Sequence, residues 1–500
     1  MALELFNTLS GKVEPLFASD GKSLRFYCCG PTVYDYGHIG NFRTFLHVDV
    51  LRRAARLHGL GLHHVMNITD VDDKIIRNAA LAGKSIAEFS ARFEQAFFED
   101  MNALAVERPE QISHATECIP EMVALIQRLA AQDIAYQAED GSWYFRIARF
   151  PAYGKLSKKD LEGIVDGARI DSDEYEKDSA RDFALWKAAK PDETSWETAI
   201  GCGRPGWHIE CSAMAMKFLG ESFDLHAGGE DLMFPHHENE IAQSESATHE
   251  PFARHWFHVR FLLVEGKKMS KSEGNFFTLR DLLLKGYRAS AIRFLLLSVP
   301  YRHQMNFTFD GLTESTNAVD RLRTFHQRIR DGKWTEDASS ASGNEELLAA
   351  IREGDEKFVA ALANDLNTAE ARAAIFDVLR AVNTAADQAK LFRAEADATL
   401  ALLTKFDSIF AVLEDRDAAH TRAALAWAEA EGRMAEVAPE VLEKFGAASL
   451  SDADIDALVA ERTLAKKQRN FARADAIRGE LLEKGIILED SKDGVRWKRQ

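Results

Sequence analysis

The sequence predicts an α/β protein whose parallel sheet is followed by a bundle of helices. Near the N-terminus, residues 22–29 form a short apolar run that Gly30-Pro31 ends, and residues 42–57 then carry apolar side chains at helical spacing. Residues 62–67 are typical of a second strand, and strands that alternate with a helix pair in parallel. Beyond residue 346, Ala- and Leu-rich sequence keeps helical spacing with little strand signal, which predicts the bundle.

The elements that follow the first strand have recognisable ends. We expect Asn41 to cap the first long helix, because asparagine is a favoured N-cap residue. An acidic turn at residues 69–73 leads into another helix. An apolar helix at residues 289–299 closes the α/β half of the chain, and a linker rich in Ser, Asp, Gly and Ala follows at residues 331–345.

The α/β pattern is interrupted once, which predicts an insertion at residues 109–206. That region contains short helices, a hairpin near residues 141–146 and a charged segment at residues 171–181. The chain ends with a predicted basic helix at residues 454–484 and two short strands at residues 485–489 and 494–498. The expected domain boundaries are 1–108 for the first half of the sheet domain, 109–206 for the insertion, 207–265 for the second half, 266–330 for a basic loop and the helices after it, 331–345 for the linker, 346–440 for the bundle and 441–500 for a C-terminal region.

Composition describes a globular chain and excludes a membrane protein. Five hundred residues predict about three domains, and no run of about 18 apolar residues is present that would cross a membrane. Charges at Glu4, Lys12 and Glu14 interrupt any signal-peptide core. The five cysteines show no paired spacing, which fits a reducing compartment. We therefore expect a cytoplasmic protein, with a monomer as the working expectation for its oligomeric state.

Charge is distributed unevenly along the chain. The formal net charge of −17 argues against indiscriminate nucleic-acid binding, which needs a positive surface to release counterions. Residues 461–500, however, carry eleven Lys or Arg against seven Asp or Glu, a local charge of +4. This tail is a candidate RNA-facing surface. The alternative is a solvated helix of mixed charge, which composition alone favours.

A set of soft and borderline ligands suggests a zinc site. His236 and Glu240 are four residues apart, so on a helix they project from one face. Cys29 and Cys211 can supply two thiolates from separate strand ends. Taken singly, each has a plainer interpretation, since paired histidines are usually surface residues and a lone cysteine is usually a small buried hydrophobe. A carboxylate in the set is unusual for structural zinc and favours a working metal.

Two further segments predict phosphate chemistry. The loop at residues 29–41 opens a helix, whose free N–H groups and dipole favour a phosphate. Gly40 lets the backbone approach closely, and His38 can donate to a phosphate oxygen. Much later, residues 267–275 form a basic loop, Lys-Lys-Met-Ser-Lys-Ser-Glu-Gly-Asn, whose lysines can neutralise charge on a departing pyrophosphate.

Together and in this order, His38-Ile-Gly-Asn41 and Lys268-Met-Ser-Lys-Ser resemble the two signature motifs of class I aminoacyl-tRNA synthetases. One departure is Asn41, where the signature has histidine; asparagine keeps a neutral donor but carries no positive charge. The stretches at residues 29–35, 67–74, 203–214 and 228–240 resemble the cysteinyl-tRNA synthetase family over nearly the whole chain. The tail from Asn470 is similar to that family's anticodon-binding region.

The resemblance implies a Rossmann-like catalytic domain with an insertion, then a helical tRNA-binding bundle and a small anticodon-binding region, with residues 266–330 contacting the tRNA stem. It implies L-cysteine, ATP and tRNA(Cys) as partners, one zinc per chain and magnesium with ATP. Its motif positions imply these site residues: for zinc, Cys29, Cys211, His236 and Glu240; for catalysis, His38, Asn41, Lys268 and Lys271; for ATP, also Gly40, Gly228, Gly229 and Asp231; for the substrate, Thr69, Trp207 and His226.

Within this set, Cys29 is preferred to Cys28, because the family cysteine directly precedes the glycine, and His237 is rejected on the same ground. Trp207 is either an apolar wall for the substrate or an ordinary core residue. A thiol-selective metal would make an editing site unnecessary.

Two other functions share these motifs. A ligase that joins activated cysteine to an amino sugar would need the same catalytic residues, but not the long extension after residue 330. A non-catalytic tRNA-binding or structural zinc protein would not need intact lysines at 268 and 271. The sequence favours the synthetase over both.

Overall fold

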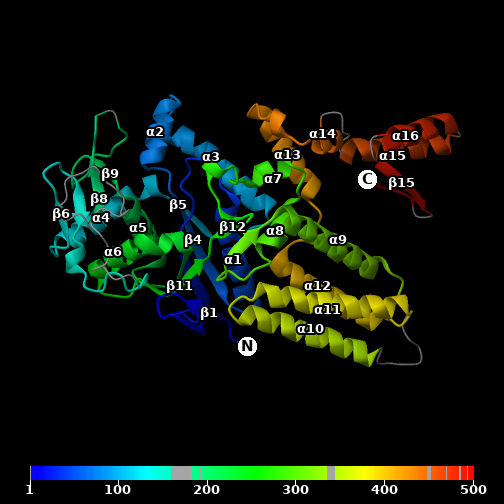
Figure 1. The fold of residues 1–500 in the computed structure, drawn as a ribbon, viewed down its shortest axis with the longest axis horizontal. Helices are drawn as coiled ribbons and strands as arrows, with labels where there is room; N and C mark the ends of the chain where they lie inside the picture. Colours follow the sequence, from blue (N-terminus) through cyan, green and yellow to red (C-terminus); the bar gives the residue numbers. More distant parts are fainter. Residues whose placement is uncertain are drawn as a thin grey trace. The chain divides into compact units, whose positions relative to one another are not determined.

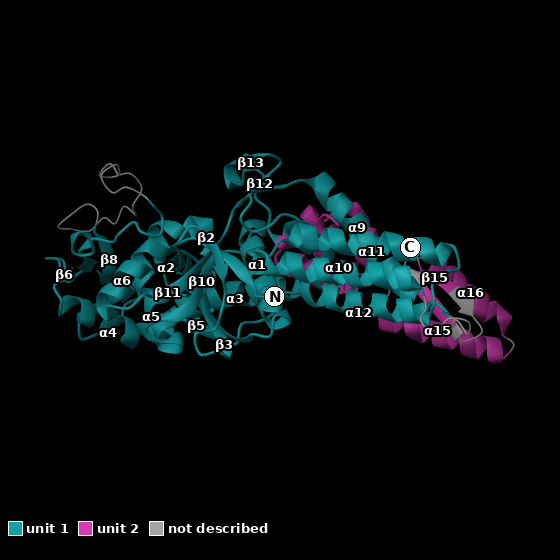
Figure 2. Ribbon diagram, turned by 90° about the horizontal axis from the view of Figure 1, so that it is seen from below, with its two compact units in different colours: residues 1–278, 290–414 teal, residues 279–289, 415–500 magenta. Residues whose placement is uncertain are grey.

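The computed structural model describes residues 2–158, 182–191, 193–334, 344–446, 452–468, 470–483, 486–491 and 494–499. The chain forms two compact units, which Figure 2 colours separately. Unit 1 contains residues 1–278 and 290–414, and unit 2 contains residues 279–289 and 415–500. Among the described helices, none combines the length and the apolar character that a membrane crossing requires.

A five-stranded parallel sheet lies at the centre of unit 1 (Figure 1), which confirms the predicted α/β class. Its strand order is β11-β10-β3-β4-β5. The strands are β3 (Ser23–Cys28), β4 (Gly61–Ile68), β5 (Gln111–His114), β10 (Phe223–Gly229) and β11 (Ala253–Val259). Because all five run in parallel, their carboxyl ends share one edge, where ligands bind in such sheets.

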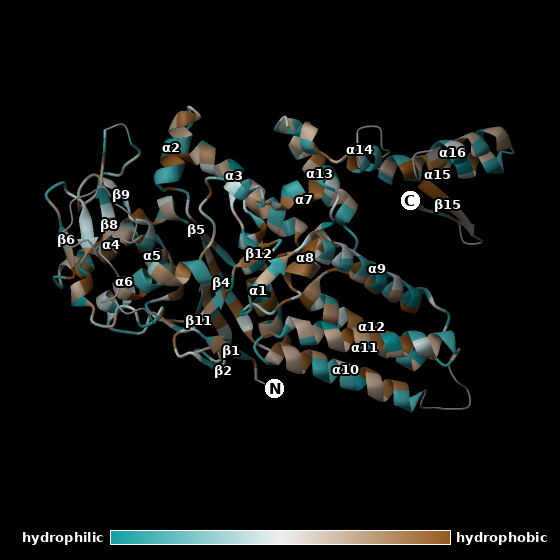
Figure 3. Ribbon diagram, viewed as in Figure 1, coloured by the Kyte–Doolittle hydropathy of each residue, from teal (hydrophilic) through white to brown (hydrophobic). Residues whose placement is uncertain are grey.

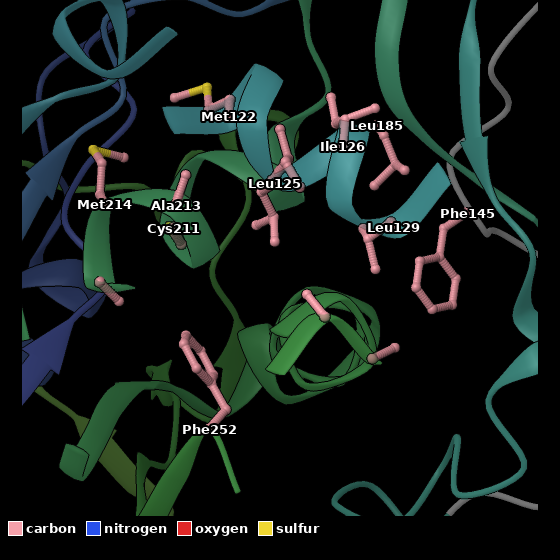
Figure 4. Close-up of a cluster of buried hydrophobic side chains, with 14 of the residues drawn as sticks. Met122, Leu125, Ile126, Leu129, Phe145, Leu185, Cys211, Ala213, Met214 and Phe252 are labelled. Atoms are coloured by element: carbon pink, nitrogen blue, oxygen red, sulfur yellow. The ribbon is translucent and has the colours of Figure 1, made fainter. Parts of the chain in front are cut away.

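Helices connect these strands, and two short strands precede them. The connecting helices are α1 (Ile39–Leu57), α2 (Asp73–Leu81), α3 (Ile86–Ala103), α4 (Ile119–Ala130), α5 (Trp207–Leu219) and α6 (Glu238–Thr248). The N-terminal hairpin pairs β1 (Glu4–Asn7) with β2 (Lys12–Pro15). Apolar residues from α4 and α5 meet in one buried cluster, in which Figure 4 labels Met122, Leu125, Cys211 and Met214.

The predicted insertion begins later than residue 109. Strand β5 and helix α4 belong to the central layers, because β5 pairs in parallel with β4. A separate antiparallel sheet then follows, with the order β6-β7-β8-β9, and it includes the predicted hairpin. Its strands are β6 (Ala135–Gln137), β7 (Trp143–Phe145), β8 (Phe183–Ala188) and β9 (Gly203–Pro205). Strand β5 is only four residues long, too short for its period to be seen in sequence. The charged segment 171–181 lies outside the described residues.

Helix α1 starts before Asn41, so the predicted cap was wrong. His38 is the N-cap residue, and its Nδ1 accepts a hydrogen bond from the Asn41 backbone N–H at 3.1 Å. In return the His38 backbone N–H donates to Asn41 Oδ1 at 3.1 Å. The sequence suggested Asn41 as the N-cap because asparagine favours that position. In the structure it is instead the third residue of the helix, whose side chain bonds back to the N-cap backbone in a capping box, a position that more often holds Glu or Gln.

A small three-stranded sheet carries the basic loop. Its order is β13-β12-β14, with β12 (Leu262–Val264) at the centre, β13 (Lys267–Lys268) and β14 (Met305–Phe307). The loop after β13 contains a single 3₁₀ turn at Lys271–Glu273. Helix α8 (Ala289–Leu296) lies where the apolar helix 289–299 was predicted.

Four long helices form the bundle of unit 1, which begins and ends earlier than predicted. They are α9 (Phe309–Asp331), α10 (Glu345–Ala363), α11 (Thr368–Asp387) and α12 (Arg393–Phe410). Helix α10 packs on α11 and α12, and α12 also packs on α9. Hydrophilic and hydrophobic residues alternate along them, as Figure 3 shows. Residues 335–343 of the predicted linker lie outside the described residues.

Unit 2 contains the segment after the basic loop and the C-terminal part of the chain. It comprises α7 (Leu279–Leu284), α13 (Asp417–Ala430), α14 (Pro439–Phe445), α15 (Asp452–Lys467), α16 (Phe471–Glu483) and the antiparallel strands β15 (Ile486–Ser491) and β16 (Gly494–Arg499). The Ala-rich stretch from 416 to 440, placed in the bundle by sequence, instead forms α13 and packs on α7.

The predicted basic helix 454–484 is two helices, not one. The first ends at Lys467, and Asn470 begins the second, because its Oδ1 accepts from the Arg473 N–H at 3.2 Å as an N-cap residue does. Both helices bury apolar side chains against the terminal hairpin, in a small core of Ile455, Ile477, Leu481, Ile486 and Leu488.

Candidate metal centre and nucleotide site

The two candidate thiols come from different kinds of element. Cys29 directly follows β3, and its backbone N–H donates to the Ala227 carbonyl of β10 at 3.1 Å. Cys211 lies within helix α5, so the prediction that both thiols come from strand ends was wrong for this residue. The strand before it, β9, ends at Pro205, and Gly206 is the N-cap residue of the helix. Both thiol-bearing residues are buried.

His236 and Glu240 lie on one continuous helical segment, as the spacing predicts. Phe234 has non-helical backbone angles, φ −142° and ψ 129°, so the chain kinks there; His236 lies after this kink and just before α6, and Glu240 lies in the first turn of α6. The His236 Nε2 atom is 3.1 Å from Glu240 Oε1.

The structure brings all four candidate ligands together. One donor atom from each of Cys29, Cys211, His236 and Glu240 lies within 4.8 Å of the others. The two sulfurs are 3.8 Å apart, and Cys29 Sγ is 3.7 Å from Glu240 Oε1. Ligands of a tetrahedral zinc lie about 3.3 to 3.8 Å from one another at ordinary bond lengths. The donor set therefore fits a zinc ion in size and in chemistry.

Two buried histidines, His208 and His226, contact the candidate ligands His236 and Glu240 on the side away from the cluster. His208 Nδ1 lies 2.9 Å from His236 Nδ1, which leaves His236 Nε2 directed at the cluster. His226 Nε2 lies 2.9 Å from Glu240 Oε2, so the other carboxylate oxygen, Oε1, faces the thiols. Such outer contacts orient ligands and tune their basicity.

His226 was predicted to contact the substrate, and the structure places it beside the candidate ligand Glu240. Its side chain is fully buried because it lies on the interior strand β10, between β11 and β3, with its ring stacked on Trp256 at 4.5 Å. Its ring nitrogen Nε2 contacts Glu240, and the substrate contact stays a prediction.

Neighbouring Cys28 and His237 lie close to the same cluster. Cys28 donates to the Cys29 carbonyl at 3.5 Å and is fully buried, and burial raises its pKa to about 12. His237 Nε2 is 3.3 Å from Cys29 Sγ, and a second possible ligand set is Cys29, His226, His237 and Glu240. His237 also lies 2.8 Å from His258, so both of its ring nitrogens have neighbours. The choice of His236 over His237 stays a prediction.

Burial governs the protonation of these groups. It raises the pKa of the Cys29 and Cys211 thiols and lowers the pKa of His236 well below its usual value. His236 is therefore neutral, which is the form that binds metals. The thiols would ionise only beside a cation, which lowers thiol pKa values strongly.

The predicted substrate residues lie around this cluster. Trp207 is 37% exposed, with its ring centroid 4.3 Å from that of His236, so it is not an ordinary core residue. Thr69 follows β4 and is buried, where its hydroxyl donates to Glu210 at 3.1 Å and accepts from Asn67 at 3.1 Å. Thr69 thus connects the end of β4 to helix α5.

The start of α1 offers a neutral donor site. Since His38 Nδ1 accepts the capping hydrogen bond, the ring proton is on Nε2, which remains to donate. Burial lowers the pKa of His38 to about 4. A β-carbon at Gly40 would lie 2.9 Å from His38 Nδ1, so only glycine leaves that ring in place. The side-chain oxygen of Asn41, Oδ1, accepts the hydrogen bond from the His38 N–H, which leaves the side-chain nitrogen, Nδ2, to donate to a ligand.

Strand β10 ends beside this site. Gly228 and Gly229 are its last two residues, and a β-carbon at Gly228 would lie 2.7 Å from the His237 ring. Asp231 follows in a 3₁₀ turn and folds back over Gly229. Glycine at 228 therefore allows close packing of the strand end against His237, whereas a β-carbon at Gly229 would meet the end of the exposed Asp231 side chain.

The basic loop approaches the start of α1. The Ile39 backbone N–H donates to the Phe277 carbonyl at 3.0 Å, which ties α1 to the end of the loop. Lys268 is exposed at the end of β13. Lys271 forms an ion pair with Asp35, with Nζ to Oδ2 at 2.6 Å. The structure thus brings Lys271 to the same loop that contains His38.

Several residues of this region were missed by sequence reasoning. Asp35 stood inside a quoted motif but carried no role, and His208 gave no signal beyond its place beside Trp207. Glu238 lies between the expected ligands and accepts backbone hydrogen bonds from Gly154 and Ser157, both at 2.9 Å. It fastens the loop from the insertion onto α6. These contacts join residues more than 80 positions apart, so no local pattern in the sequence indicates them.

Comparison with known proteins defines the class. Residues 16–317 match the family described as tRNA synthetases class I (C) catalytic domain, and residues 357–414 match the DALR domain. A solved Mycobacterium tuberculosis methionyl-tRNA synthetase in complex with methionyl-adenylate has the same fold, with a TM-score of 0.56 and 17% identity over 85% of this chain and 94% of that one. The protein is therefore a class I aminoacyl-tRNA synthetase.

Full-length relatives narrow the class further. A cysteine–tRNA ligase of Koribacter versatilis is 60% identical over 100% of both chains, and one of Solibacter usitatus is 51% identical over the same span. One of Leptospira interrogans is 43% identical over 100% of this chain and 99% of its own. The chain belongs to the cysteine–tRNA ligase family.

Proposed function

We propose that this enzyme activates L-cysteine with ATP to cysteinyl-adenylate and diphosphate, and then transfers the cysteinyl group to tRNA(Cys). The observation that carries the choice of amino acid is the cluster of Cys29, Cys211, His236 and Glu240. It lies at the carboxyl edge of the sheet, where Cys29 follows β3 and the next turns open helix α1. One edge of the sheet thus presents residues that would hold a thiol-binding metal, beside a helix start that suits a phosphate.

Zinc is the metal that fits these donors. Two sulfurs, one imidazole and one carboxylate are soft and borderline ligands, which favour zinc over magnesium or calcium. Bound there, zinc would supply a centre that coordinates a substrate thiolate and binds the hydroxyl of serine poorly. His208 would hold the His236 ring in its orientation, and His226 would hold the Glu240 carboxylate, while the substrate binds and leaves. Trp207, partly exposed beside His236, would cover the small side chain.

Activation is mostly a matter of positioning. A cysteine carboxylate oxygen attacks the α-phosphorus of ATP, and the bond to diphosphate breaks. His38 Nε2–H and the free N–H groups of α1 hold phosphate oxygens without contributing a full charge. Lys268 and Lys271 neutralise charge on the leaving diphosphate, with Lys271 as the more important of the two. Magnesium accompanies ATP, and Gly228, Gly229 and Asp231 border the adenosine.

The acceptor is a tRNA and not a small molecule. An amino sugar would need no counterpart of α9–α12 or of unit 2, whereas the full-length match to tRNA ligases includes both. The DALR domain covers most of α10–α12, and the basic tail of unit 2 supplies positive surface for the anticodon region. We place the enzyme in the cytoplasm and expect it to act as a monomer.

The test is ATP–pyrophosphate exchange with cysteine, serine or no amino acid, before and after chelation, followed by tRNA charging. We expect exchange with cysteine, loss on chelation, and a preference over serine above the roughly 200-fold limit of simple shape selection. Exchange with serine at comparable efficiency would contradict the metal's role. Charging of an amino sugar in place of tRNA would contradict the acceptor.

Two cysteine variants test whether zinc binding and cysteine-dependent exchange depend on the cluster. Cys211→Ser should lose zinc and cysteine-dependent exchange together, because a hydroxyl is a poor ligand. Cys202→Ser is the matched control, since Cys202 is only half-buried and contacts Ser195 at 3.5 Å, outside the cluster. Equal zinc content in both variants would remove Cys211 from the ligand set.

A further inference from the structure

Asp35 forms an ion pair that no step of activation uses. It lies in the loop between β3 and α1, and its Oδ2 is 2.6 Å from Lys271 Nζ. Its other oxygen, Oδ1, accepts from the Tyr36 backbone N–H at 2.8 Å, which holds the carboxylate in place. The lysine that should face the leaving diphosphate is therefore held by a fixed carboxylate.

The basic loop reaches α1 with its backbone already ordered. The Ser270 backbone N–H donates to Asn275 Oδ1 at 2.8 Å, and Asn275 Nδ2 donates to the Lys268 carbonyl at 3.1 Å. Gly274 turns the chain with a φ of +68°, a conformation that suits glycine. These contacts fix the backbone around Lys271, so the long lysine side chain is the part that can change partner.

Lys271 also lies near the group expected to hold phosphate. Its Nζ is 5.1 Å from the centre of the Phe276 ring, and the His38 ring lies 5.1 Å from that same ring. Lysine and histidine thus border one aromatic side chain. A triphosphate at the start of α1 would come within reach of Lys271 and would meet the Asp35 carboxylate as a competing anion.

The ion pair is weak enough to be exchanged. The Lys271 and Asp35 side chains are 66% and 38% exposed, and pairs as exposed as this contribute little to stability. A polyphosphate carries more charge than one carboxylate, so Lys271 gains by transferring to it. We propose that Asp35 is a positioning residue that holds Lys271 before ATP binds and releases it to the triphosphate. This inference rests on the proposed function, because it assigns Lys271 to the leaving diphosphate.

The test is a double-mutant cycle on the affinity for magnesium-ATP, measured by calorimetry without cysteine. Asp35→Asn, which keeps the shape and the Tyr36 contact, should tighten ATP binding about 2- to 5-fold, the range of one exposed pair. In a Lys271→Gln background the same change should have no effect, because no lysine remains to be released. The KM for ATP in exchange should fall in parallel in Asp35→Asn, with kcat within about twofold of wild type.

Controls distinguish the release of Lys271 from simple repulsion between a carboxylate and ATP, and from magnesium binding by Asp35. Glu273→Gln removes a carboxylate from the same loop, 3.6 Å from Lys267, and should leave ATP affinity unchanged. Weaker ATP binding in Asp35→Asn would overturn the proposal and indicate that Asp35 holds magnesium. An equal gain in the Lys271→Gln background would overturn it too, because it would show simple repulsion. Failure of wild-type exchange with cysteine would instead contradict the proposed function itself.

Discussion

His38 shows how one side chain can have a structural and a chemical role at the same time. Its Nδ1 atom accepts the hydrogen bond that caps α1, and this fixes the ring proton on Nε2. Burial lowers its pKa from 6.5 to about 4, so the ring is neutral at physiological pH. His38 can therefore offer a phosphate one directed hydrogen bond, while positive charge comes from Lys268 and Lys271.

The pH dependence of ATP use tests this protonation state. The ratio of kcat/KM for ATP between wild type and His38→Gln should be constant from about pH 6 to about pH 8, because His38 is neutral throughout. With an ordinary histidine pKa, the ratio would fall by more than about tenfold as pH rises. Exchange kinetics at several pH values measure it.

The same lowered pKa has a consequence for stability. Between about pH 4 and 6.5 the unfolded chain binds a proton at His38 and the folded chain does not. His38 therefore makes the folded state less stable as pH falls through that window, and it has no such effect above about pH 6.5.

Site residues were predictable where their chemistry is rare. Cysteine, histidine and glutamate within short motifs marked Cys29, Cys211, His236 and Glu240, and the fold brings them together. The contact between His226 and Glu240 was not predictable, because sequence does not show which neighbours a side chain on a strand meets. Only the packing shows that His226 lies behind Glu240.

At the scale of elements, Arg293 connects three helices of unit 1. From α8 it donates to Asp49 of α1 at 2.7 Å and to the Leu104 carbonyl after α3 at 2.8 Å. It also donates to the carbonyls of Ile409 at 3.0 Å and Phe410 at 2.5 Å, at the end of α12. Since Arg293 and Asp49 are both buried, this contact joins the bundle to the helix that bears His38.

Removing this arginine should destabilise unit 1. Arg293→Met leaves the buried Asp49 charge with Arg53 and the Glu107 backbone N–H as its remaining partners, and breaking a buried pair costs about 3 to 5 kcal/mol. Arg330→Met is the control, because its pair with Asp331 is 57% and 43% exposed and such pairs contribute at most about 1 kcal/mol. Urea unfolding followed by circular dichroism compares the two. Equal midpoints would contradict the assigned role of Arg293.

Elements with strong periodicity were predictable, and short ones were not. The strands at 22–29 and 62–67 and the long helix between them match β3, β4 and α1 closely. β5 was missed as part of the sheet because four residues show no period. The break between α15 and α16 was missed because Asn470 is an ordinary polar residue in a helical pattern until its cap is seen.

At the scale of the whole molecule, each compact unit is built from two separate stretches of the chain. Helix α7 follows the basic loop in sequence but belongs to unit 2, where it packs on α13. Within unit 2, Arg433 pairs with Asp281 of α7 at 2.9 Å. Sequence placed the bundle boundary near 440 because α13 is as Ala-rich as α11. The partner of a helix is decided by its buried face, which composition does not show.

The central claim is that the metal centre selects cysteine by binding its thiolate. X-ray absorption at the zinc edge, on wild-type enzyme with and without amino acid, tests it most directly. Two sulfur neighbours, from Cys29 and Cys211, should surround the metal in the free enzyme. Saturating L-cysteine should add a third sulfur, and L-serine should leave two. An unchanged sulfur count with cysteine bound would contradict the account.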